Sequence, residues 1–109
     1  MEKIHSNAAG IDIGSTKVFI GTKDGVVQSF GTFTSDFKLA TEYLKEKQVE
    51  TIAMEATGVY WVILYDILVD TGFDVWLVDG RQTKQVPGRK TDVKDCSWIQ
   101  ELHSFGLLK

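Results

Sequence analysis

Residues 8–14 form the run Ala8-Ala9-Gly10-Ile11-Asp12-Ile13-Gly14. The run is small and apolar except for Asp12, which stands between two isoleucines. β-Branched residues at alternate positions favour a strand. A carboxylate inside an apolar strand is costly to bury unless a partner or a ligand compensates for it. The run therefore predicts a first strand, and Asp12 is the first candidate for a functional residue.

The residues that follow predict two more strands joined by tight turns. Residues 17–21 and 26–33 are the expected strands. Gly14-Ser15 supplies the first turn. Lys23-Asp24-Gly25 supplies the second, because Asp-Gly between apolar runs is a strong hairpin signal. We expect these three strands to form an antiparallel meander.

Helices and strands alternate in the rest of the chain. The expected elements are a helix with its N-cap at Ser35 and its end near Lys47, a buried strand at 51–54, a well-buried helix at 61–69, a strand at 74–78, and a last helix capped by Thr91. Gly72 is placed to end the second helix. A meander followed by β-α-β units predicts an α/β fold: a five-stranded mixed sheet with flanking helices in the ribonuclease H-like order.

Composition limits the class of protein. The chain has 109 residues, of which 43% are apolar and 25% charged, which is ordinary globular usage. We expect a single domain spanning 1–109. The longest apolar stretch, 59–69, is too short for a membrane span, which needs about 20 residues. The N-terminus lacks the apolar core of a signal peptide. The single cysteine, Cys96, excludes an internal disulfide. The expected compartment is the cytoplasm.

Three places in the chain carry carboxylates that the fold prediction brings together. Asp12 lies in the first strand, and Glu55 ends the fourth. Asp92 and Asp95 are three residues apart at the start of the last helix and share one of its faces. Clustered carboxylates repel each other unless hard cations neutralise them. Mg²⁺ takes oxygen ligands and substrate phosphates, and two such ions can support phosphoryl transfer. We therefore expect two Mg²⁺ or Mn²⁺ ions here.

The charge balance fits such a site. The net charge is −3, from 12 basic and 15 acidic residues, and an acidic balance argues mildly against nucleic-acid binding. With four of the acidic residues committed to metal, the remaining eleven no longer outnumber the basic ones. The loop at 80–90 carries cations suited to phosphate contacts. The candidate nucleic-acid-binding residues are Arg81, Lys84, Arg89 and Lys90.

Three segments together resemble a known family. They are residues 10–14 (Gly-Ile-Asp-Ile-Gly), 54–58 (Met-Glu-Ala-Thr-Gly) and 86–95 (Val-Pro-Gly-Arg-Lys-Thr-Asp-Val-Lys-Asp). In this order they resemble the N-terminal, RuvC-like catalytic domain of DEDD transposases of the insertion sequence 110 family. The resemblance covers about residues 9–109. It implies that Asp12, Glu55, Asp92 and Asp95 are the catalytic, metal-holding positions.

The resemblance also implies an activity and partners. The activity is metal-dependent cleavage and transfer of DNA strands during transposition or site-specific recombination. The partners are DNA, a guide RNA encoded by the element, and further copies of the chain in a homo-oligomer of the full-length protein. Members of the family continue into a C-terminal domain with a serine nucleophile. This chain stops at Lys109, so we expect that domain to be absent here and recombination by this chain to be incomplete.

Two other interpretations remain open. Residues 12–17 (Asp-Ile-Gly-Ser-Thr-Lys) also resemble the first phosphate loop of actin-like ATPases and sugar kinases. That class needs a second lobe and does not account for Asp92 and Asp95. The other interpretation is a transposase remnant without catalysis that binds nucleic acid or dimerises through an apolar helix. Substitution of Asp12 by asparagine separates catalysis from simple binding.

Overall fold

The computed structural model describes residues 4–56, 58–80 and 95–108. Within these ranges it has a five-stranded mixed sheet flanked by helices, which confirms the predicted α/β class. The elements are β1 (Ala8–Ile13), β2 (Val18–Gly21), β3 (Val27–Phe30), α1 (Thr34–Glu46), β4 (Thr51–Glu55), α2 (Trp61–Thr71), β5 (Asp74–Val78) and α4 (Asp95–Ser104).

The strand order in the sheet is β3-β2-β1-β4-β5. β1, β2 and β3 are antiparallel neighbours, so the predicted meander is confirmed. β4 runs parallel to β1, and β5 runs parallel to β4. The carboxyl ends of β1, β4 and β5 therefore lie at the same edge of the sheet, where α/β folds place their ligands.

Turn chemistry fixes the two hairpins. The Gly14 N–H donates to the Lys17 carbonyl oxygen at 2.8 Å and closes the first turn. In the second turn the Asp24 carboxylate accepts the Val26 N–H at 3.1 Å and the Thr22 hydroxyl. Gly25 has a φ of 83°, in the left-handed region that glycine adopts without steric cost. These local bonds set the register of the meander.

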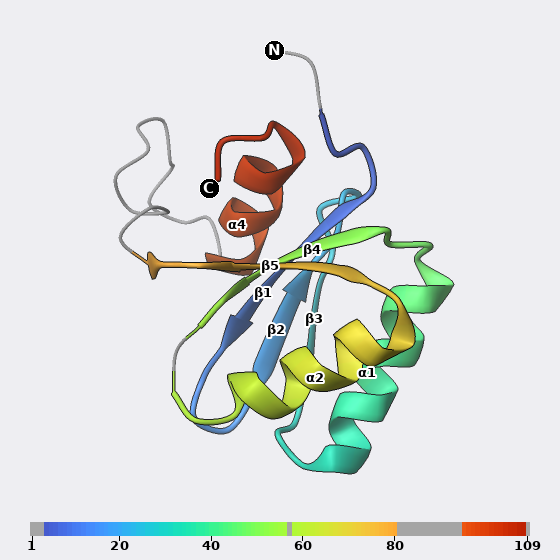
Figure 1. The fold of residues 1–109 in the computed structure, drawn as a ribbon, viewed down its shortest axis with the longest axis vertical. Helices are drawn as coiled ribbons and strands as arrows, with labels where there is room; N and C mark the ends of the chain where they lie inside the picture. The colour runs from blue at the N-terminus through green and yellow to red at the C-terminus, as the bar shows by residue number, and fades with distance from the viewer. Residues whose placement is uncertain (1–3, 57, 81–94, 109) are drawn as a thin grey trace.

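The two faces of the sheet are covered by different helices. Figure 1 shows α1 and α2 together on one side of the sheet and α4 on the other. The α1–α2 side holds the larger apolar cluster, whose bulkiest buried side chains include Phe37, Ile11 and Leu44. The α4 side holds a second cluster: Ala53, Val78, Trp98, Ile99, Leu102 and Leu108. Alternation along β4 places Ile52 and Met54 in the first cluster and Ala53 in the second.

Three local predictions were wrong. The predicted N-cap, Ser35, lies inside α1, which starts at Thr34 after Phe33. The reason is Asp36, whose carboxylate accepts the Phe33 N–H at 3.1 Å, so the helix is capped two residues earlier than predicted. β3 is shorter than predicted and ends at Phe30. α2 is not well buried, because only Leu64 and Leu68 are enclosed where it crosses the sheet beside α1.

Gly72 ends α2 with a φ of 110°, as the sequence predicted. The strand 74–78 also has its predicted bounds. The predicted cap Thr91 and the loop 80–90, apart from Gly80, lie outside the described residues. In the part of the chain that the structure describes, we find no helix long and apolar enough to cross a membrane.

Candidate metal and nucleic-acid site

Asp12 and Glu55 occupy adjacent positions at the edge of the sheet. The parallel pairing of β1 and β4 aligns Ile11 with Met54. Asp12 and Glu55 are the next residues on these two strands, so both carboxylates leave the sheet on the face that α4 covers. Both residues are half-buried. The sequence prediction that these two acidic residues come together requires β1 and β4 to be neighbours. The structure has this strand order.

α4 brings a third acidic residue to the same place. A cavity of about 210 Å³ is lined by Asp12, Phe19, Asp95 and Cys96; we call it the carboxylate cavity. Asp12 comes from β1, Phe19 from the neighbouring β2, and the other two residues from the first turn of α4. Two of the four predicted acidic residues, distant in sequence, thus share one cavity.

Glu55 lies against the backbone that follows β5. A Cβ atom built on Gly80 would fall closer than 3.0 Å to Oε1 of Glu55, so the carboxylate occupies the space that a side chain at this position would take. Gly80 follows β5, whose Val78 pairs with Glu55 in the sheet. The absence of a side chain at Gly80 thus leaves room for the third carboxylate at this edge.

The negative charge at the carboxylate cavity affects the pKa of the Cys96 thiol. Cys96 is 1% exposed. Burial raises the pKa of the Cys96 thiol, and the negative charge of Asp12 contributes in the same direction. Cys96 is therefore a protonated, apolar side chain at neutral pH. It contributes no thiolate to the cavity.

The remaining predicted site residues lie outside the described residues. They are Asp92 of the acidic set and the four cations Arg81, Lys84, Arg89 and Lys90. Within 4–56, 58–80 and 95–108, no three histidine, cysteine, aspartate or glutamate side chains stand close enough together to hold a metal ion. The described part of the site therefore offers the Asp12 and Asp95 pair, with Glu55 next to Asp12.

The donor chemistry of this pair fits a hard cation. Carboxylate oxygens are the ligands that Mg²⁺ prefers, and Mg²⁺ usually keeps several waters while one or two carboxylates bind it. Asp12 is half-buried and Asp95 is exposed, so the cavity leaves room for water or a phosphate oxygen beside them. Asp12 and Asp95 are thus the described pair able to hold such an ion, with Glu55 next to Asp12 on the adjacent strand.

Several residues that shape the site were not predicted from the sequence. Phe19 forms one wall of the carboxylate cavity, and its strand position alone does not indicate that role. Gly10 and Gly21 lie under α4 and let its backbone approach the sheet. A glycine inside a strand is the signal that points to such an approach.

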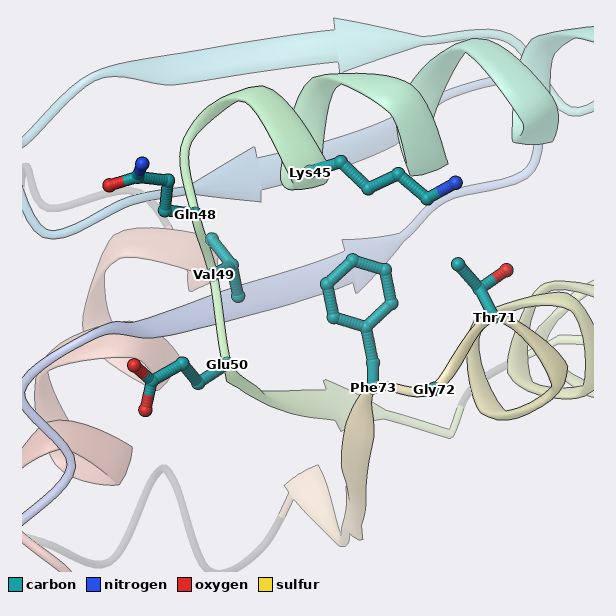
Figure 2. A pocket seen from close by; sticks show the side chains of 7 residues that line it. All are labelled: Lys45, Gln48, Val49, Glu50, Thr71, Gly72 and Phe73. Carbon is teal, nitrogen blue, oxygen red and sulfur yellow. The ribbon is translucent and has the colours of Figure 1, made fainter.

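A larger cavity lies at the opposite edge of the sheet. It has a volume of about 420 Å³ and contains none of the predicted site residues. Figure 2 shows it between the ends of α1 and α2, with Phe73 at its centre and Lys45 and Glu50 on different sides. Its two charges are of opposite sign, and the β4 and β5 strands begin, not end, beside it. We assign it no part in the site.

A buried polar cluster occupies the far end of α4. The Thr51 hydroxyl donates to the Asp74 carboxylate at 2.9 Å, so the 2.8 Å bond between Thr51 and His103 must have Nε2 of His103 as its donor. Trp76 also donates to Asp74, and His5 stacks on His103 at 4.5 Å between ring centroids. Burial lowers the pKa of His103 to about 4. His103 is thus a neutral structural residue at the opposite end of α4 from the carboxylate cavity.

Comparison with known proteins adds two findings. The family model of DEDD transposases of insertion sequence 110, described as a transposase, matches residues 9–109. The structure also matches that of T. thermophilus RuvC in complex with Holliday junction substrate, with a TM-score of 0.67 at 15% identity, over 96% of this chain and 99% of that one. No match was found among curated protein sequences. The structural match confirms the RuvC-like, ribonuclease H-like fold, and the family match shows that this chain belongs to the DEDD transposases of the insertion sequence 110 family.

Proposed function

We propose that this chain is a divalent-metal-dependent catalytic domain that cleaves and transfers DNA strands. The observation that carries the proposal is that Asp12 and Asp95 line one cavity. Glu55 stands next to Asp12 on the adjacent parallel strand. We propose Asp92 as the fourth acidic residue of the set. Membership of a transposase family supports this class of reaction.

The side chains at the cavity have distinct tasks in this proposal. Asp12 and Asp95 hold Mg²⁺ or Mn²⁺, and Glu55 completes or flanks the ligand set. The metal supplies activation of an attacking oxygen and stabilisation of a leaving oxygen in phosphoryl transfer. Phe19 forms an apolar wall, which limits water and strengthens the electrostatic attraction between carboxylate and cation. The exposure of Asp95 leaves one side open for a phosphate group.

DNA is the proposed substrate. RuvC, whose fold this chain shares, was solved in complex with Holliday junction substrate. We propose that Arg81, Lys84, Arg89 and Lys90 contact the phosphates, since the sequence places them just before Asp92 and Asp95. The guide RNA and the homo-oligomer of the full-length protein remain predictions from the family resemblance.

A metal titration of thermal stability tests the proposal. Wild type, Asp12→Asn and the control Asp70→Asn are heated with increasing Mg²⁺ or Mn²⁺, with and without ATP. Asp70 is exposed on α2, across the sheet from the cavity. An ion at a hundredfold excess over its Kd stabilises the folded state by about 2.7 kcal/mol. For this chain length we expect a rise in Tm on the order of 10 °C in wild type and Asp70→Asn, and none in Asp12→Asn.

The other outcomes favour other functions. A rise that requires metal and ATP together would favour the phosphate-loop interpretation of residues 12–17. Binding of DNA that neither metal nor Asp12→Asn alters would favour a remnant without catalysis. An equal rise in wild type and Asp12→Asn would contradict the proposed metal site.

A further inference from the structure

Two glycines form a side-chain-free contact under α4. Gly10 of β1 and Gly21 of β2 are paired across the antiparallel strands, so they lie side by side on the α4 face. We call them the glycine pair. A Cβ atom on Gly10 would lie closer than 3.0 Å to the Cys96 carbonyl oxygen and to the Gln100 nitrogen. A Cβ atom on Gly21 would lie 3.0 Å from the same Cys96 carbonyl group. The backbone of α4 therefore rests directly on the backbone of the sheet.

Space, not backbone conformation, requires glycine at these positions. Neither Gly10 nor Gly21 has a positive φ, so an L-residue can adopt the local conformation. The obstructing atoms are main-chain atoms of α4, which cannot rotate away as a side chain can. One turn further along, the Gln100 side chain donates to the Ala8 carbonyl oxygen at 3.1 Å and holds the helix down on β1. An alanine at Gly10 must therefore lift the first turn of α4.

The same contact governs the carboxylates. Asp12 is two residues after Gly10, on the same strand and face. Asp95 directly precedes Cys96, whose carbonyl stands over Gly10. The height of α4 above Gly10 therefore determines how far the Asp95 carboxylate is from that of Asp12 across the carboxylate cavity.

We propose that Gly10, assisted by Gly21, is a positioning residue that sets the separation of Asp12 and Asp95 and thereby the selectivity of the site for Mg²⁺. The inference rests on the proposed metal site. Mg²⁺ demands near-ideal octahedral geometry at short distances, whereas Ca²⁺ accepts longer and more variable ligand distances. A lifted helix thus penalises Mg²⁺ more than Ca²⁺, while a general loss of stability penalises both alike.

The chain contains its own reporter of the height of α4. Cys96 is the only cysteine, it is 1% exposed, and its main chain touches the glycine pair. Its rate of reaction with an aromatic disulfide reagent under native conditions measures how often this turn of the helix opens. Because no metal is needed, the measurement is independent of activity.

The experiment compares Gly10→Ala and Gly21→Ala with wild type and with Gly25→Ala. Gly25 is a matched control, because a Cβ atom there meets nothing within 4 Å and its φ of 83° makes alanine destabilising for conformational reasons alone. Relative to wild type, we expect Gly10→Ala to raise the Cys96 labelling rate at least about tenfold, since local opening governs that rate. Gly21→Ala has a smaller effect, in keeping with its longer distance. Gly25→Ala leaves the labelling rate within about twofold.

Metal affinity supplies the second readout. We expect Gly10→Ala to raise the Kd for Mg²⁺ at least about tenfold and the Kd for Ca²⁺ less than about threefold, because only Mg²⁺ is strict about ligand distance. Gly21→Ala changes the Mg²⁺ to Ca²⁺ ratio in the same direction, and it decides the question if Gly10→Ala does not fold. Gly25→Ala keeps the ratio of the wild type.

The outcomes separate this inference from the function on which it rests. If Asp12→Asn binds both ions as wild type does, the metal site is refuted, and the positioning role falls with it. If Asp12→Asn abolishes binding but both glycine-pair variants keep wild-type labelling and the wild-type Mg²⁺ to Ca²⁺ ratio, the positioning role alone is overturned. Faster labelling with an altered ratio in Gly10→Ala or Gly21→Ala supports both.

Discussion

The two faces of the sheet are built on opposite packing rules. The face under α1 and α2 meets its helices through large apolar side chains such as Phe37, Ile11 and Leu44, all fully buried. The face under α4 has a smaller apolar cluster and, at the glycine pair, the main chain of the helix lies close to the main chain of the sheet. Interdigitated side chains make one face a core. Close backbone approach makes the other a support for residues that must be placed accurately.

Polar groups follow the same division. On the α4 side, His103 and Gln100 are buried and hydrogen-bonded to Thr51 and to the main chain of β1. On the other side the buried Thr41 satisfies its hydroxyl within its own helix, through the Phe37 carbonyl oxygen. We therefore expect substitutions that remove volume to lower the free energy of unfolding most on the α1–α2 face. Substitutions that add volume should lower it most on the α4 face.

The largest effect is expected from Phe37→Ala on the α1 side. Removal of a fully buried aromatic ring destabilises a protein by about 3–5 kcal/mol, from lost burial and the cavity left behind. Urea unfolding measures the change, and the exposed Leu39 on the same helix gives the control Leu39→Ala, expected within about 0.5 kcal/mol of wild type. At temperatures where Phe37→Ala is folded, Cys96 labelling stays slow. Fast labelling in this variant would contradict the independence of the two faces.

The meander and the β-α-β order could be predicted because local signals decide them. Asp24-Gly25 is a strong local signal for a hairpin between two strands, and Gly72 ends a helix through its own backbone freedom. Asp12 was identifiable because a charge between two isoleucines is costly without a partner. That Asp12 and Glu55 are adjacent follows from β1 and β4 being neighbours in the predicted strand order, which the structure has.

Features that depend on a distant partner could not be predicted. The exposure of α2 depends on how much of its surface α1 and the sheet cover. An apolar sequence does not show how large that covered surface is. Phe19 lines the carboxylate cavity only because α4 places Asp95 opposite it. The sequence does not indicate the hydrogen-bond partner of His103. Thr51 bonds to His103 and to Asp74, and these three residues are distant in sequence and meet only in the folded chain.

The second effect is a pH dependence that belongs to the α4 face. The pKa of His103 is about 4 in the folded chain, lowered chiefly by burial and then by His5, against the opposing charge of Asp74. The unfolded chain has the ordinary value near 6.5, so it binds more protons between these values. The stability from neutral His103 is therefore complete above about pH 6.5 and is lost as the pH falls toward 4, by about 3 kcal/mol in all.

Unfolding in urea at pH 7, 6, 5 and 4 checks this dependence. The control is His103→Gln, whose amide can still donate to Thr51 but does not titrate. We expect the variant to lose less stability than wild type between pH 6.5 and 4. Parallel curves for the two proteins would mean that other groups cause the acid sensitivity.

The smallest effect comes from a pair of adjacent residues that point to opposite faces. Ile52 belongs to the α1–α2 core, and Ala53, paired with Gly10, belongs to the cluster under α4. Ile52→Val removes one methylene and costs about 0.5–1.5 kcal/mol. Ala53→Val adds volume beneath a helix already in close contact and costs about 1–3 kcal/mol, although valine is the better strand former. Urea unfolding ranks the two variants. Only Ala53→Val should also speed Cys96 labelling, because only this substitution pushes α4 away from the sheet. If Ala53→Val instead stabilised the protein, the α4 face would have room for a larger side chain, and its small residues would not determine the position of the helix.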